Sequence, residues 1–202
     1  MTARTFIAGV PLLMVGALFT PLAAAAAPAA TATPKALSLT AKDVQQQYGA
    51  AFRPFIVNTY KASKYKTCGA DYTGGYLATF ANFGKSHKPV GVVSVQGSVF
   101  AYADARSTAC ASKAHGLSLA TTLSRHGTTV RASRLSGVGD SAYLFTSISP
   151  AGAGKHAYSV IIWLTRGMHV AMVTVSALGS APAQSGAVTL AKIVDGRIQA
   201  AG

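Results

Sequence analysis

Apolar residues near residue 40 recur every four positions, which is typical of a helix with one buried face. The residues that follow this spacing are Val44, Tyr48 and Phe52. Thr40 precedes them as a candidate N-cap and Asp43 follows three positions later, so the pair predicts a capping box. A helix is therefore expected to begin near Thr40 and to end shortly before Pro54, because the residue that precedes a proline is disfavoured in the helical conformation.

In the middle of the chain, the pattern of polar and apolar residues changes several times. Residues 61–75 are polar and rich in turn formers, which predicts a loop. Residues 98–114 place small and apolar side chains at helical spacing, and residues 117–123 alternate as a strand does. The predicted face of that helix is Phe100, Ala103, Ser107, Cys110 and Ala114. The other strands predicted in this part of the chain are 76–83, 90–95 and the basic stretch 126–135.

The C-terminal part has the strongest strand patterns. Three segments are rich in β-branched and aromatic residues or alternate in polarity, and we predict strands at 142–148, 158–165 and 168–176. Gly137 and Gly139 lie in a turn before them, and Arg166-Gly167 is predicted as a two-residue hairpin loop. A last helix is expected over 183–200. Its predicted buried stripe is Ala187, Leu190, Ala191, Val194 and Ile198.

Consecutive hairpins between helices indicate an antiparallel sheet. The predicted fold class is therefore α+β: a two-layer domain in which an antiparallel β-sheet is covered by helices on one side and held by one disulfide. The sequence has no internal repeat and no second region of different amino-acid composition, so residues 37–202 are expected to form a single α+β domain.

The N-terminal residues have the composition of an export signal. Arg4 is followed by an apolar run from Phe6 to Phe19, and then by an alanine-rich stretch suited to signal peptidase. We predict a signal peptide at 1–26, a Pro/Ala/Thr tether at 27–36, and a secreted, extracytoplasmic protein with no membrane span after cleavage. The alternative is an uncleaved anchor, since the apolar stretch is long enough to span a bilayer.

The chain contains two cysteines, Cys68 and Cys110. An even number of cysteines in an exported chain predicts a disulfide, because oxidising compartments keep such bonds formed. Their separation does not match a CxxC redox pair.

The chain is strongly basic. It has 18 Lys and Arg against 5 Asp, no Glu, and a formal net charge of +13. Such a charge attracts polyanions, so a cell-wall polymer or an anionic surface is a candidate partner. The alternative is that the charge serves solubility. Export argues against genomic nucleic acid. The candidate polyanion-binding residues form two clusters, Lys61, Lys64 and Lys66 and then Arg125, Arg131 and Arg134.

Recognisable catalytic motifs are absent from the sequence. There is no GxSxG elbow, no phosphate-binding Gly-Lys-Ser/Thr loop and no GxGxxG, and the five histidines lack metal-ligand spacing. We therefore predict no catalytic residues, no metal and no cofactor. Asp43 is expected to be a cap residue, Asp140 a turn residue and His169 a strand residue with a structural role.

The C-terminal half resembles a known group of domains. The residues that carry the resemblance are Gly137-Val-Gly139-Asp140-Ser-Ala142, a hairpin at Arg166-Gly167, the run HVAMVTVS and a last helix LAKIVDGRI. In this order they resemble actinobacterial extracytoplasmic sensor-like domains and small secreted or lipoprotein-like domains, including the outer domain of a mycobacterial Ser/Thr kinase. This chain lacks a lipobox cysteine and has two cysteines where that domain has four. The resemblance implies a helix-covered antiparallel sheet with a ligand cleft and no catalytic residues.

The leading hypothesis is a secreted, non-enzymatic binding or sensor-like domain at the cell envelope, whose ligand the sequence does not identify. The side chains that we expect to line its ligand groove are aromatic. They are Tyr76, Phe80, Tyr143, Phe145 and Trp163. All five could equally be core residues, as strand aromatics commonly are. The alternatives are an exported hydrolase with an unconventional His/Asp site, and a structural or polyanion-binding envelope protein.

Overall fold

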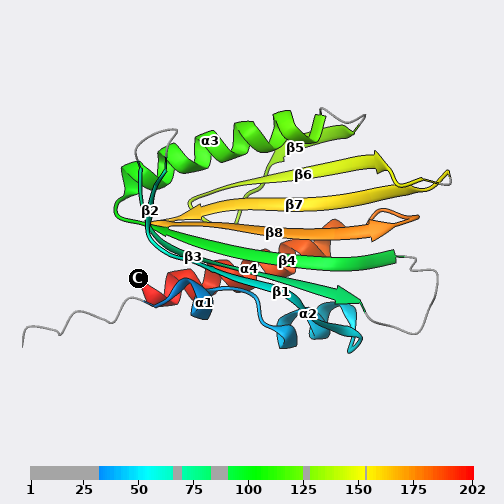
Figure 1. Ribbon diagram of the computed structural model, residues 1–202, viewed down its shortest axis with the longest axis horizontal. Coiled ribbons are helices and arrows are strands. Elements are labelled where there is room, and N and C mark those ends of the chain that lie inside the picture. Colours follow the sequence, from blue (N-terminus) through cyan, green and yellow to red (C-terminus); the bar gives the residue numbers. More distant parts are fainter. Residues whose placement is uncertain (1–31, 66–69, 83–90, 125–127, 153) are drawn as a thin grey trace, which may run out of the picture.

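The computed structural model describes residues 32–65, 70–82, 91–124, 128–152 and 154–202 (Figure 1). Side chains at 63–65, 70–72, 114–120 and 122–124 are not described, and the predicted signal peptide lies outside the described residues. The helices are α1 (Pro34–Leu37), α2 (Ala41–Tyr48), α3 (Ala105–Ser124) and α4 (Gln184–Ala201). The strands are β1 (Phe52–Tyr60), β2 (Ser63–Tyr65), β3 (Ala70–Asn82), β4 (Gly91–Tyr102), β5 (Thr129–Arg134), β6 (Ser141–Pro150), β7 (His156–Arg166) and β8 (His169–Leu178).

One antiparallel sheet organises the described residues. Its strand order is β1-β3-β4-β8-β7-β6-β5, and β2 pairs with β3 beside the end of β1. The hairpins β6–β7 and β7–β8 follow the sequence prediction. The last pair of the second hairpin is Arg166 with His169, so its two loop residues are Gly167 and Met168, one position later than predicted. Gly167 has a φ of 53°, a conformation that favours glycine.

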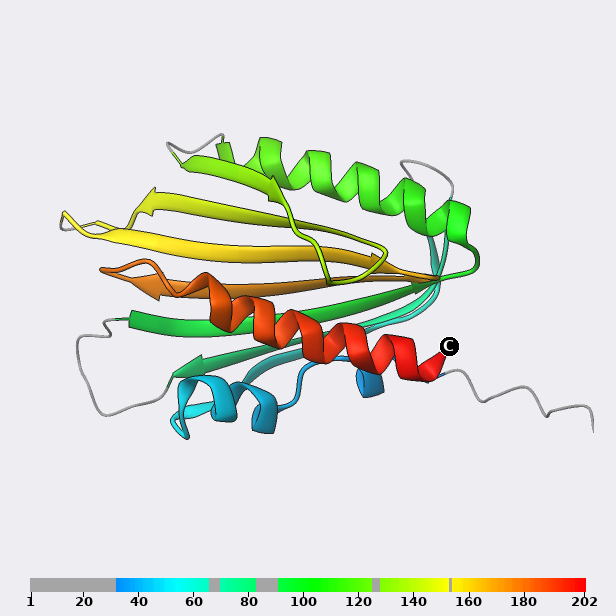
Figure 2. The same ribbon diagram turned by 180° about the vertical axis from the view of Figure 1, so that it is seen from behind.

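Helices cover both faces of the sheet, so the prediction that they cover one side is wrong. α4 crosses one face together with α1 and α2, and α3 lies over the other (Figures 1 and 2). The sheet therefore has two hydrophobic cores, which we call the α4 core, on the face that α1, α2 and α4 cover, and the α3 core, on the face that α3 covers. Neighbouring residues of β7 lie in different cores, because Ile162 packs in the α4 core and Trp163 in the α3 core. The Trp163 Nε1–H donates to Ser112 Oγ of α3 at 3.0 Å. The fold is therefore α+β with a helical layer on each face of the sheet.

The α4 layer follows the sequence pattern closely. All five predicted stripe residues of α4 are buried, and they pack on alternate residues of the central strands. The capping box of α2 is also confirmed, with the Thr40 backbone N–H donating to Asp43 Oδ2 at 2.7 Å. Leu39 packs against Gly97 of β4, where an added Cβ would lie 2.9 Å from the leucine side chain. Glycine at 97 thus lets the N-terminal segment approach the sheet closely.

Several predicted boundaries are wrong, for identifiable physical reasons. Residues 98–102 continue β4, where they pair with β3 and β8, and the helix begins only after Asp104. The alternation at 117–123 belongs to α3, since leucine and alanine are among the strongest helix formers. The α2 helix ends at Tyr48, and Phe52 begins β1, which the sequence analysis missed. Ala70–Gly75, predicted as loop, belongs to β3.

The folded part begins within the predicted tether. Pro34–Leu37 form one helical turn capped by Thr33, and Leu37 is buried in the α4 core. The described domain therefore includes residues before 37.

Candidate functional site

A cavity of about 340 Å³ lies on the α4 face of the sheet, near the edge formed by β5. Its floor comes from β5, β6 and β7, and its wall from Ala181, Pro182 and Gln184 just before and at the start of α4. Two cross-strand rows build the floor: Thr129, Ile148 and Tyr158 in one, and Arg131, Thr146 and Val160 in the other. Directly opposed residues in a sheet share a face. Val160 belongs to the α4 core, so both rows face α4.

The cavity lining combines one cation with hydroxyl groups and apolar surface. Arg131 supplies the charge and is exposed, and no ion pair to it is found in the described part of the chain. Thr129 and Thr146 supply hydroxyl groups that can donate or accept hydrogen bonds. Ile148 and Tyr158 supply apolar surface. A few polar groups on an apolar lining are typical of a small-molecule site, and this set suits a ligand with an anionic group on an apolar body.

The five predicted groove aromatics do not line one groove. Tyr76 and Phe80 are buried in the α4 core, whereas Phe145 and Trp163 are buried in the α3 core. Tyr143 also faces the α3 side, where it is exposed and its ring lies 6.4 Å from that of Phe145. The prediction failed because alternate strand residues point to opposite faces, and both faces of this sheet are covered.

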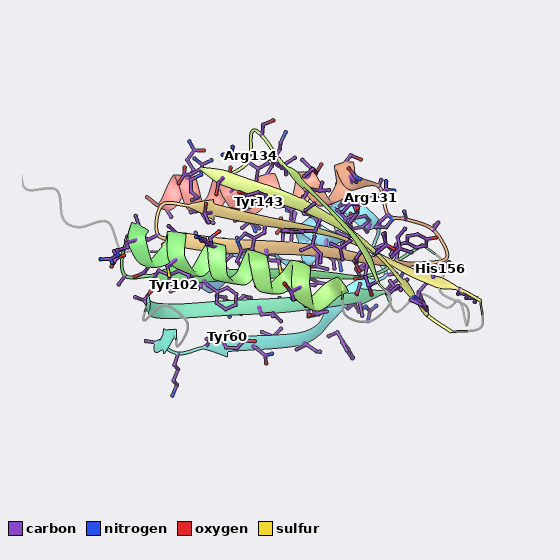
Figure 3. All side chains as sticks on the ribbon, turned by 90° about the horizontal axis from the view of Figure 1, so that it is seen from above. Tyr60, Tyr102, Arg131, Arg134, Tyr143 and His156 are labelled. Atoms are coloured by element: carbon purple, nitrogen blue, oxygen red, sulfur yellow. The ribbon has the colours of Figure 1, made fainter. Side chains whose placement is uncertain are left out.

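The predicted basic residues are divided between the two edges of the sheet. Lys61 follows β1 at one edge, and Arg131 and Arg134 lie on β5 at the other, where Figure 3 shows them. Arg131 faces the α4 side, but Arg134 pairs with Tyr143 and faces the α3 side. The Lys64 side chain, Lys66 and Arg125 lie outside the described residues. The structure therefore does not bring Lys61 and the β5 arginines into one patch.

Asp195 holds α4 to the β7–β8 hairpin. Arg166 donates to it through Nε at 2.7 Å and through Nη2 at 2.8 Å. The Gly139 N–H donates to Asp195 Oδ2 at 3.0 Å. Hydrogen bonds from Arg166 lower the pKa of Asp195 and outweigh the opposing effect of burial. Gly139 has a φ of 62°, and an added Cβ would lie 2.6 Å from the Thr165 carbonyl oxygen, so glycine is required there.

Three further aspartates also have structural partners. Asp43 caps α2 and binds Arg197 of α4 at 2.9 Å, and Arg197 also donates to the Ser38 carbonyl. Burial raises the pKa of Asp43, but hydrogen bonds from Arg197 and Thr40 together lower it below its ordinary value. Asp140 accepts from the Gly167 N–H at 2.7 Å, and Asp104 accepts from the Ser107 N–H at 2.6 Å. The structural roles predicted for Asp43 and Asp140 agree with these contacts.

The histidines provide no described acid–base pair. His156 and His169 are the two whose side chains are described, and neither forms a hydrogen bond or an ion pair with an aspartate in the part of the chain that the structure describes. His156 packs against Tyr158 with ring centroids 6.3 Å apart. Burial lowers the pKa of His169. Among the described residues, no group of His, Cys, Asp or Glu has an arrangement that would hold a metal.

Cys110 lies in α3 and is partly buried, and it is not a free thiol. Cys68 lies outside the described residues. The Cys68–Cys110 disulfide therefore remains a prediction.

The cavity residues were missed by the sequence analysis, apart from Arg131. Their period-two pattern was visible in three separate strands, but the sequence does not reveal which positions of those strands lie side by side.

No helix in the described part of the chain is long and apolar enough to cross a membrane.

Comparison with solved structures places this architecture among known folds. The chain is similar in fold to the extracellular domain of PknH from Mycobacterium tuberculosis. The TM-score is 0.56 with 14% sequence identity, over 85% of this chain and 99% of the PknH domain. This is a domain of the type that the sequence resemblance indicated, and at this identity the likeness concerns the fold. No protein-family model and no curated protein matches the chain.

Proposed function

We propose that this protein is an extracytoplasmic, non-enzymatic, sensor-like domain that binds a small ligand in the cavity between β5, β6, β7 and the start of α4. The observation that carries the proposal is the cavity itself, whose lining combines one arginine with hydroxyl and apolar groups. The similarity in fold to an extracellular domain supports the location. The use of four aspartates in caps and ion pairs supports binding over hydrolysis.

The chemistry of the lining favours an anionic ligand with an apolar body. A charge-assisted hydrogen bond from Arg131 would hold the anion, and Ile148 and Tyr158 would contact the apolar part. Naphthalenesulfonate has both features and serves as a probe. We expect it to shift the amide resonances of Thr129, Thr146 and Val160 in nitrogen–proton correlation spectra. Arg131→Ala should weaken its binding about tenfold or more, as expected for loss of a hydrogen bond to a charged group.

Arg134→Ala is the matched control, because Arg134 lies on the same strand but faces the α3 side. It should leave the affinity within about twofold of the unmodified protein, since only a distant charge is removed. Equal weakening by both variants would indicate attraction to the general positive charge and not to the cavity. The absence of shifts at the cavity amides would contradict the proposed site.

We further propose that Cys68 and Cys110 form a disulfide in an oxidising compartment. The enclosed loop is of a length for which the chain-entropy model gives roughly 4 kcal/mol of stabilisation. Purified protein from an oxidising compartment should therefore contain no alkylatable thiol under denaturing conditions until a reductant is added. The double variant Cys68→Ser/Cys110→Ser should unfold at markedly lower urea concentration. Two reactive thiols in the unreduced protein would contradict the bond.

A further inference from the structure

The edge strand β1 exposes several large apolar side chains to solvent. Eight of its nine residues, from Arg53 to Tyr60, are exposed. Four of the exposed large hydrophobic residues in the described part of the chain lie on this strand, namely Phe55 (62%), Ile56 (45%), Val57 (51%) and Tyr60 (39%). Figure 3 shows Tyr60 at this edge of the sheet, whereas Arg131 and Arg134 lie at the other edge. A contiguous exposed apolar strand marks an interaction surface or an aggregation hazard.

Among the residues that the structure describes, no strand pairs with the outer side of β1. Within the described sheet β1 pairs with β3 alone, so the outward-pointing N–H and C=O groups are not part of a ladder. The beginning of the strand is protected, since Gln45 binds the Phe52 carbonyl, Pro54 lacks an N–H, and the pairing is irregular between Pro54 and Ile56. The segment from Ile56 to Tyr60 pairs with β3 in a regular register and contains no proline.

The charges around β1 indicate which kind of strand fits. The segment Phe55–Tyr60 is uncharged, and it is flanked by the exposed cations Arg53 and Lys61. Neither cation has an ion pair in the described part of the chain. They lie eight positions apart, which corresponds to about 26 Å along a strand. A complementary strand would therefore have an apolar centre and an acidic residue near each end.

We propose that β1 is a docking strand for an extended segment of another protein, with an apolar centre and acidic ends, which adds to the sheet at this edge. Backbone hydrogen bonds would supply affinity, as in other cases of strand addition. Arg53 and Lys61 would select the acidic ends. This site is separate from the cavity, which lies near the β5 edge, so it does not depend on the proposed ligand site.

A second copy of this chain fits the edge less well. Full antiparallel overlap of two β1 strands would place Arg53 of each copy opposite Lys61 of the other. Like charges directly opposite each other in a sheet are destabilising, and each copy has a formal net charge of +13.

The test uses fluorescein-labelled nonapeptides and the unmodified mature protein. One peptide has alternating Val and Thr with Asp near each end, and the other has Lys in place of each Asp. Fluorescence anisotropy should show that the Asp peptide binds at least tenfold more tightly and that salt reduces the difference. Equal binding of the two peptides, or binding of neither, would overturn the proposal.

Two variants locate the binding. Val57→Asp places a negative charge at the exposed centre of β1 and should weaken binding of the Asp peptide at least tenfold. Met168→Asp is the matched control, because Met168 is also an exposed hydrophobic residue, 43% exposed, but lies in the β7–β8 loop. Equal weakening by both variants would show that the peptide binds elsewhere. A dimer of the free protein that Val57→Asp dissociates would assign the edge to a second copy and overturn the proposal.

Discussion

Replacing Trp163 by alanine is expected to lower the free energy of unfolding by about 3–5 kcal/mol, the usual cost of removing a buried large aromatic side chain. Trp163 is only 7% exposed, packs between β7 and α3, and donates to Ser112. Its loss would leave a cavity under α3 and would leave Ser112 without this donor. Urea unfolding followed by far-ultraviolet circular dichroism measures the effect. Tryptophan fluorescence cannot serve, because Trp163 is the chain's single tryptophan.

Tyr143→Ala is the control, since Tyr143 pairs directly with Trp163 but is 43% exposed. We expect it to cost about 1 kcal/mol or less. Equal destabilisation by the two variants would contradict the assignment of Trp163 to the α3 core. Unchanged stability of Trp163→Ala would contradict it as well.

Asp195→Asn is expected to cost about 2–4 kcal/mol, because it removes the charge that pairs with Arg166 at a largely buried position. Arg166 would keep its charge with only the exposed Asp140 nearby. Asp140→Asn is the matched control within the same cluster. Its side chain is 58% exposed, so its substitution should cost no more than about 1 kcal/mol. Urea denaturation of both variants near neutral pH measures the difference, and equal costs would contradict the assigned roles.

The same ion pair predicts how stability depends on pH. Hydrogen bonds from Arg166 hold the pKa of Asp195 below its ordinary value of 3.8, so the folded state binds a proton less readily than the unfolded state. The stabilisation is fully present above the ordinary pKa and is lost as the pH falls through the lowered one. Asp43, whose pKa is also lowered, contributes in the same direction. Asp195→Asn should therefore lose less stability on acidification than the unmodified protein, and an identical loss would contradict this linkage.

Local patterns predicted the elements that depend on near neighbours. The capping box at Thr40 and Asp43 spans three positions, and its geometry needs no distant partner. The buried stripe of α4 follows from helical periodicity, and β6, β7 and β8 are joined by short loops with positive-φ glycines at 152, 154 and 167. Residues 98–124 were predicted less well. Their small and apolar residues fit either a helix or a strand, and pairing of β4 with β3 and β8 decides where the strand ends.

The sequence by itself determined the α+β class, the C-terminal hairpins, the amphipathic last helix and the basic charge of the chain. The tertiary structure decided that α3 covers the second face, and this placed Phe145 and Trp163 in a core and not in a groove. It also brought Arg131, Thr146 and Val160 into one row of the cavity floor and left β1 at an open edge. The physical reason is that strand order and register join residues far apart in the chain, and that burial of a strand side chain depends on what covers its face.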